Sequence, residues 1–113
     1  MPDSDVLLTV EDANFDDLVL SSDVPVLVDF WAPWCPPCGP YSKVVAELAE
    51  EFRGRMVMAT LNSDDNPTST IAYGVMAMPT VLVFRDREFV LSLVGARSKS
   101  ALRKALEEVL ATA

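Results

Sequence analysis

The chain contains no histidine and only two cysteines, and each scarcity limits its chemistry. Without histidine, neither a Ser-His-Asp triad nor a Cys-His pair can form, so a nucleophile would need another source of activation. Structural zinc takes four Cys or His ligands, and two cysteines cannot close such a site within one copy of the chain. Four thiolates shared by two copies could still hold zinc or an iron–sulfur cluster, and this alternative stays open.

Positive charge is also scarce, with nine basic residues against seventeen acidic ones and a net charge of −8. Nucleic-acid binding needs a cationic face, so we expect no nucleic-acid partner. No apolar stretch approaches the roughly 20 residues of a membrane-spanning helix, and we expect no membrane partner. The acidic segment 1–5 lacks the basic and apolar regions of a signal peptide. We therefore expect a cytoplasmic protein, although the mature form of a secreted protein would have the same features.

The remaining composition favours one compact domain over residues 1–113. Half of the residues are apolar, which is enough for a single core, and no linker or internal repeat divides the chain. Apolar patterns predict strands at 5–9, 26–31, 56–61, 81–84 and 89–94. Helical spacing predicts helices from residue 9 or 11 to 20, at 39–52, at 67–73, and from a cap at Ser98 or Ser100 to about Leu110.

This order of elements predicts an α/β fold. We expect a central mixed sheet with a parallel part and an antiparallel edge hairpin, covered by helices on both faces. The hairpin connection at 85–88 contains neither Gly nor Asn, so we expect a turn longer than two residues.

Cys35 and Cys38 lie between the predicted strand 26–31 and the predicted helix 39–52. Both sulfurs therefore fall at or near a helix N-terminus, where free N–H groups and the helix dipole favour a thiolate. One thiolate can attack a substrate disulfide, and the other can resolve the mixed disulfide that results. The pattern predicts a site of dithiol–disulfide exchange.

Several motifs around the cysteines occur together in a known family. They are Val28-Asp29-Phe30-Trp31-Ala32 leading into Trp34-Cys35-x-x-Cys38, then Met78-Pro79-Thr80, then Val94-Gly95-Ala96. From about Val6 to Leu110 the chain resembles a thioredoxin. The resemblance implies the thioredoxin fold, protein-disulfide reductase activity in electron transport and redox homeostasis, and no cofactor beyond the Cys35–Cys38 disulfide. It also implies protein disulfides as substrates and a thioredoxin reductase as partner, and we expect a monomer.

The resemblance implies roles for single residues. Cys35 would be the exposed attacking thiol, Cys38 the buried resolving thiol, Asp29 the buried carboxylate that handles the Cys38 proton, and Pro79 a cis-proline beside the disulfide. The residues in contact with substrate would be Trp34, Pro36, Pro37, Met78, Gly95 and Ala96. Physical chemistry supports two of these roles independently. An aspartate inside an apolar strand should have a raised pKa, and X-Pro bonds are the ones for which cis is inexpensive.

The tryptophans near the cysteines need separate assignments. Both Trp31 and Trp34 could belong to the core. We assign Trp31 to packing and Trp34 to the rim of the site.

The chain departs from the family pattern in four places. Pro36-Pro37 replaces Gly-Pro, Gly39 replaces a basic residue, Lys43 replaces a kinking proline while Pro40 precedes it, and Thr60 replaces a lysine. The two prolines remove N–H groups near the thiolate, so we expect a shifted reduction potential. Loss of the lysine near the buried aspartate should raise the pKa of that carboxyl further. A thiol oxidase or isomerase, and a binding subunit with idle cysteines, remain alternative functions.

Overall fold

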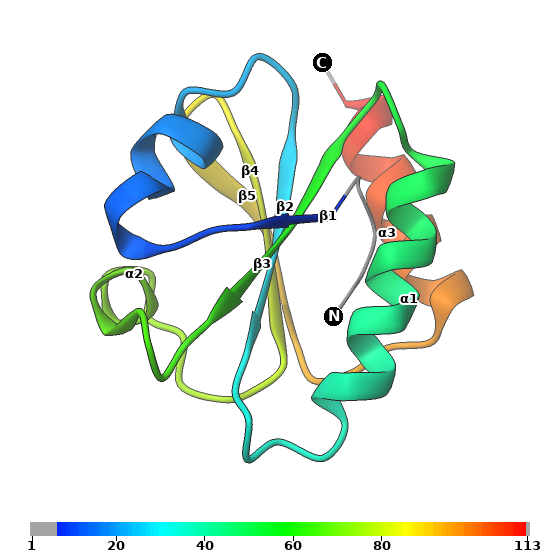
Figure 1. Cartoon of the computed structure of the whole chain (residues 1–113). Coiled ribbons are helices and arrows are strands. Elements are labelled where there is room, and N and C mark those ends of the chain that lie inside the picture. The colour runs from blue at the N-terminus through cyan, green and yellow to red at the C-terminus, as the bar shows by residue number, and fades with distance from the viewer. Residues whose placement is uncertain (1–6, 113) are drawn as a thin grey trace.

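The structure is a computed structural model that describes residues 7–112, and its centre is a five-stranded mixed sheet in the order β1-β3-β2-β4-β5 (Figure 1). The strands are β1 (Leu7–Thr9), β2 (Val26–Trp31), β3 (Val57–Asn62), β4 (Thr80–Arg85) and β5 (Glu88–Val94). The first three pair in parallel, and β4 and β5 add an antiparallel edge. The predicted fold class is confirmed. Residues 5 and 6 of the first predicted strand lie outside the described residues.

Helices cover both faces of this sheet, as Figure 1 shows. The helices α1 (Cys38–Glu51) and α3 (Lys99–Ala111) pack on one face, where Leu27 of β2 joins their core. The short helix α2 (Pro67–Ala72) and the segments η1 (Asp12–Asn14) and η2 (Asp16–Leu20) lie over the other face. Val26, Val28 and Phe30 of β2 belong to the core on that side. Among the described residues, no helix is long and apolar enough to cross a membrane.

The alternation of β2 decides where its one acidic residue points. Successive side chains of a strand lie on opposite faces, so Asp29 shares the face of Leu27 and turns toward α1. Thr60 of β3 and Val81 of β4 are its register partners on either side. This arrangement places one buried carboxyl beneath the helix that begins at Cys38.

The predicted first helix is interrupted in the structure. A 3₁₀ turn, η1, is followed by the wider helical segment η2, in which the Ser21 N–H donates to the Asp16 carbonyl oxygen. The side chain of Asn14 accepts a hydrogen bond from the Glu11 N–H at 2.8 Å. The Asp12 carboxylate accepts the N–H groups of Thr68 and Ser69 in α2. Side chains that bond the backbone in this way compete with a continuous helix.

The hairpin turn between β4 and β5 corrects the sequence prediction. Arg85 pairs directly with Glu88, which leaves only Asp86 and Arg87 in the turn. Their φ angles are 55° and 71°, the left-handed values that a two-residue hairpin turn of type I′ requires at both positions. The expected longer turn is therefore wrong. Asp tolerates this conformation, and the flanking strand pairing holds Arg87 in it.

Candidate active site

Cys35 and Cys38 form a disulfide at the start of α1, with their Cα atoms 5.5 Å apart. The Cys38 N–H donates to the carbonyl oxygen of Cys35, and the Cys35 N–H donates to that of Ala32, each at 3.2 Å. Cys35 is 7% exposed and Cys38 is 2% exposed, so Cys35 is the more accessible of the two residues. The expectation of an exposed Cys35 is nevertheless wrong for this disulfide form, because the loop buries both cysteines. Pro36 and Pro37 carry no N–H, and the donors at this end of the helix begin at Cys38.

Asp29 lies in the interior behind the disulfide loop. Its side chain has no exposed surface, which confirms the predicted burial. The Ser42 hydroxyl donates a hydrogen bond to its Oδ2 at 3.1 Å. Among the described residues, Oδ1 has no hydrogen-bond partner. Burial raises the pKa of Asp29 to about 7, against the opposing effect of the Ser42 hydrogen bond.

Two loops distant in sequence meet beside the strand ends. The Met78–Pro79 peptide bond is cis, as predicted, and Pro79 is buried. Its carbonyl oxygen accepts the Gly95 N–H at 2.8 Å. Met78 is half-buried, with its sulfur 3.4 Å from the Ser63 hydroxyl oxygen. The antiparallel pairing of Thr80 with both Phe30 and Val94 brings these loops to the end of β2, from which the cysteine loop departs.

The tryptophans occupy different positions. Trp34 is 63% exposed, and its indole N–H donates to Asp64 Oδ1 at 3.1 Å, in agreement with its assignment to the rim. Trp31 is only half-buried, and it lines an open groove instead of being enclosed in the core. Its assignment to packing is therefore correct only in part, because the side chain is partly exposed along this groove.

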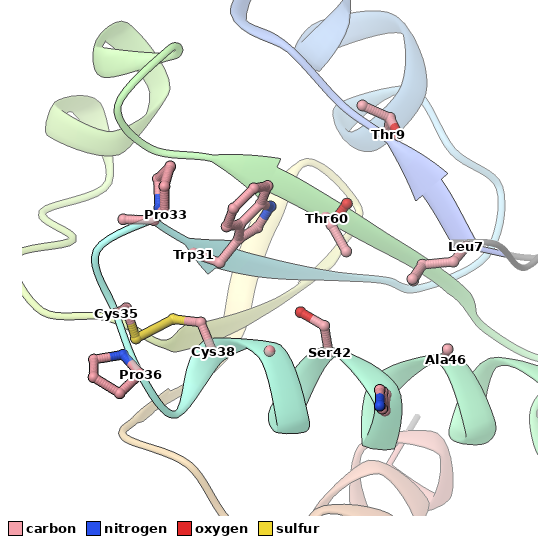
Figure 2. Close-up of a pocket in the computed structure, with 13 residues that line it drawn as sticks. Leu7, Thr9, Trp31, Pro33, Cys35, Pro36, Cys38, Ser42, Ala46 and Thr60 are labelled. Carbon is pink, nitrogen blue, oxygen red and sulfur yellow. A yellow bond between two sulfur atoms is a disulfide. The ribbon is translucent and has the colours of Figure 1, made fainter. Parts of the chain in front are cut away.

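The open groove has a volume of about 1010 Å³ and runs between the sheet and α1 (Figure 2). It begins at Leu7 and Thr9 of β1 and reaches both cysteines. Ser42 and Thr60 line it, and Figure 2 shows the Ser42 hydroxyl pointing from α1 toward the sheet. Of the predicted substrate-contacting residues, Pro36 lines the groove, while Trp34, Pro37 and Ala96 are exposed outside it.

Ser42 is the site residue that the sequence prediction missed. A signal for it existed, because position 42 lies four residues after Cys38 and so shares one face of the helix. Among the described residues, no group of three or more His, Cys, Asp or Glu side chains is placed to hold a metal ion.

Comparison with known proteins gives the same family throughout. Residues 6–108 match the family model described as thioredoxin. The thioredoxin of Porphyra purpurea is 44% identical over 101 residues, which cover 89% of this chain and 94% of that protein. The thioredoxin of Synechocystis sp. is 43% identical over the same shares. The chloroplastic M-type thioredoxin of Pisum sativum is 42% identical over 89% of this chain and 59% of its own length.

Proposed function

The chain belongs to the thioredoxin family, and from that premise we propose how its residues carry out protein-disulfide reduction. The activity itself follows from the family and from the closed Cys35–Cys38 pair at the start of α1, which is the observation that carries it. In thiol–disulfide exchange the two cysteines carry the electrons, so no separate cofactor is needed. The roles of single residues and the protein's setting are our proposals.

The reaction begins from the reduced pair. The Cys35 thiolate attacks one sulfur of a substrate disulfide, the substrate S–S bond breaks, and one substrate thiolate leaves. Cys38 then gives its proton to Asp29 and attacks the Cys35 sulfur, and the bond from Cys35 to the substrate breaks, which releases the second substrate thiolate as the Cys35–Cys38 bond forms. A reductase returns two electrons. The greater exposure of Cys35 and the position of Asp29 on the α1 side of β2 support this order.

We assign substrate docking to the exposed surface around the disulfide. The proposed contacts are Trp34, Pro36, Pro37, Met78, Gly95 and Ala96. The hydrogen bond between Gly95 and Pro79 supports this assignment, because it joins the two loops into one surface. Gly95 has a φ of +91° and no Cβ, so the backbone of an extended substrate could approach it closely.

The setting of the protein is proposed as well. We place it in the cytoplasm as a monomeric, single-domain carrier of electrons between a thioredoxin reductase and protein disulfides. The single sheet shared by both core clusters supports one domain. Relatives include chloroplastic M-type thioredoxins, so fractionation of the source cells would test the location directly.

The reduction potential of the Cys35–Cys38 couple tests the proposed direction of the reaction. Tryptophan fluorescence in defined redox buffers would follow the couple, because Trp34 and Trp31 lie beside it. A value near about −270 mV supports a reductant. A value of about −180 to −120 mV would contradict it and favour a thiol oxidase or isomerase. Pro36 and Pro37 have no N–H groups near the thiolate, so we expect the reduction potential to be shifted, and this measurement gives the direction of the shift.

A further inference from the structure

Ser42 and Cys38 lie on one face of α1, one helical turn apart. That face looks toward β2 and β3, and the next residue along it, Ala46, also lines the groove. Because the alternation of β2 turns Asp29 toward α1, the Ser42 hydroxyl reaches the carboxyl and donates to Oδ2 at 3.1 Å. Helix periodicity thus places the Ser42 hydroxyl one turn from Cys38, and strand alternation places the Asp29 carboxyl within hydrogen-bond distance of that hydroxyl.

The hydroxyl is the one hydrogen-bond donor that the described residues offer to this carboxyl. The register partners of Asp29 on the neighbouring strands, Thr60 and Val81, carry no charge. Ser42 is itself half-buried and lines the open groove, whereas Asp29 has no exposed surface. Ser42 therefore stands between the buried carboxyl and the solvent side of the site.

We propose that Ser42 is a positioning residue for the resolving step: its hydroxyl holds Asp29 by Oδ2 and leaves Oδ1 free to accept the Cys38 proton. This inference rests on the proposed role of Asp29. In the step, the Cys38 S–H bond breaks and its proton goes to Oδ1. The Cys38 sulfur bonds to the Cys35 sulfur, and the bond from Cys35 to the substrate breaks, with its electron pair going to the departing substrate sulfur. The hydrogen bond from Ser42 favours the ionised carboxylate that this step consumes.

Few other titratable groups act near this carboxyl. Tyr41 of α1 has its pKa raised to about 12, by burial first and by the Asp29 charge second, with Arg97 opposing the shift. Tyr41 is therefore protonated at neutral pH. Lys43 contributes a cation to the groove wall, and it stays unchanged in every variant below. A pH profile of the resolving step near neutrality therefore reports chiefly on Asp29 and Cys38.

The test is the rate of the resolving step as a function of pH, measured by stopped-flow fluorescence on the mixed disulfide. Ser42→Ala removes the donor, and we expect the midpoint assigned to Asp29 to rise by about one unit. A rise of one unit from about 7 lowers the ionised fraction at pH 7, and hence the rate, about fivefold. The difference should largely disappear above about pH 9, where Asp29 is ionised in both proteins.

Two variants serve as controls. Ser42→Thr keeps the hydroxyl and should restore the wild-type midpoint. Thr9→Val deletes a hydroxyl from the same groove on β1, away from Asp29, and should leave the profile unchanged.

Asp29→Asn separates failure of this inference from failure of the role on which it rests. If Asp29→Asn slows the resolving step, and adding Ser42→Ala to that variant slows it no further, the two residues act as a unit. That outcome supports the inference. An unchanged midpoint in Ser42→Ala, or an equal loss in the Asp29→Asn background, would overturn the role of Ser42 while leaving that of Asp29 intact. An unaffected Asp29→Asn protein would overturn both, whereas loss of exchange in the wild-type protein would overturn the proposed function.

Discussion

The Gly95 N–H donates a hydrogen bond to the carbonyl oxygen of Pro79 at 2.8 Å. Thr80 and Val94, the neighbours of these residues, are themselves paired across β4 and β5. The hydrogen bond therefore extends the ladder of the sheet by one step into the two loops beside the disulfide. We therefore expect a substitution in either loop to alter the backbone geometry of the other.

Gly95→Ala should weaken the reduction of protein disulfides. Gly95 has a φ of +91°, where an added Cβ costs about 1 kcal/mol or more even though it meets no atom within 4 Å. The methyl group would also face the approaching substrate backbone, and we expect kcat/KM for a protein disulfide to fall about tenfold. The matched control is Gly54→Ala, at a φ of +86° beyond the end of α1. Equal kinetic losses in both variants would contradict the docking role of Gly95.

Cys35→Ser should abolish disulfide exchange, because a hydroxyl cannot replace the attacking thiolate. Cys38→Ser should still attack but should accumulate mixed disulfides with the substrate, since the resolving sulfur is absent. Non-reducing gels and mass spectrometry of the trapped species would check both outcomes. Full activity of Cys35→Ser would contradict the dithiol mechanism, whereas trapping through Cys38 in that variant would reverse the assigned order of attack.

Asp29 should make the stability of the oxidised protein dependent on pH. Its pKa rises from 3.8 to about 7 on folding, so the folded state binds the proton more tightly than the unfolded chain. This favourable contribution is complete below about pH 4 and is lost as the pH rises to about 7. The whole change is on the order of 4 kcal/mol.

Urea unfolding of wild-type and Asp29→Asn proteins between pH 4 and 8 would measure that change. The wild-type protein should lose stability relative to the variant as the pH rises through this window. Parallel curves for the two proteins would show that Asp29 is ionised at the same pH in the folded and unfolded states.

Asp12→Ala should destabilise the fold, because it removes hydrogen bonds between η1 and α2. Its carboxylate accepts the N–H groups of Thr68 and Ser69 at 3.1 and 2.8 Å and so caps α2. Burial raises the pKa of Asp12, but the hydrogen bonds from Ser69 and Thr68 outweigh it and leave the pKa below its ordinary value. Loss of a helix cap costs about 1 kcal/mol. The control is Asp17→Ala, which removes an exposed acidic residue of η2. Thermal unfolding should give a lower melting temperature for Asp12→Ala than for Asp17→Ala. Equal melting temperatures would contradict the capping role of Asp12.

The sequence was sufficient for the parts of this protein that depend on neighbours along the chain. The strand predicted at 26–31 is β2 residue for residue, and the helix predicted at 39–52 is α1 displaced by one residue. Periodicity predicts such elements because a strand buried on both faces and an amphipathic helix each repeat their apolar residues at a fixed interval. The spacing of Cys35 and Cys38 likewise indicated the disulfide that the structure contains.

Only the tertiary structure decided which polar groups meet. The Ser42 hydroxyl bonds a carboxyl on another element, and the Asp12 carboxylate caps a helix more than fifty residues away. Arg87 adopts a left-handed conformation that its residue type does not favour, because the pairing of Arg85 with Glu88 leaves a two-residue turn that requires it. Hydrogen bonds and strand pairing of this kind depend on how distant segments pack, and no local pattern encodes them. The sequence therefore determined the elements and the reactive pair, and packing determined which polar groups surround them.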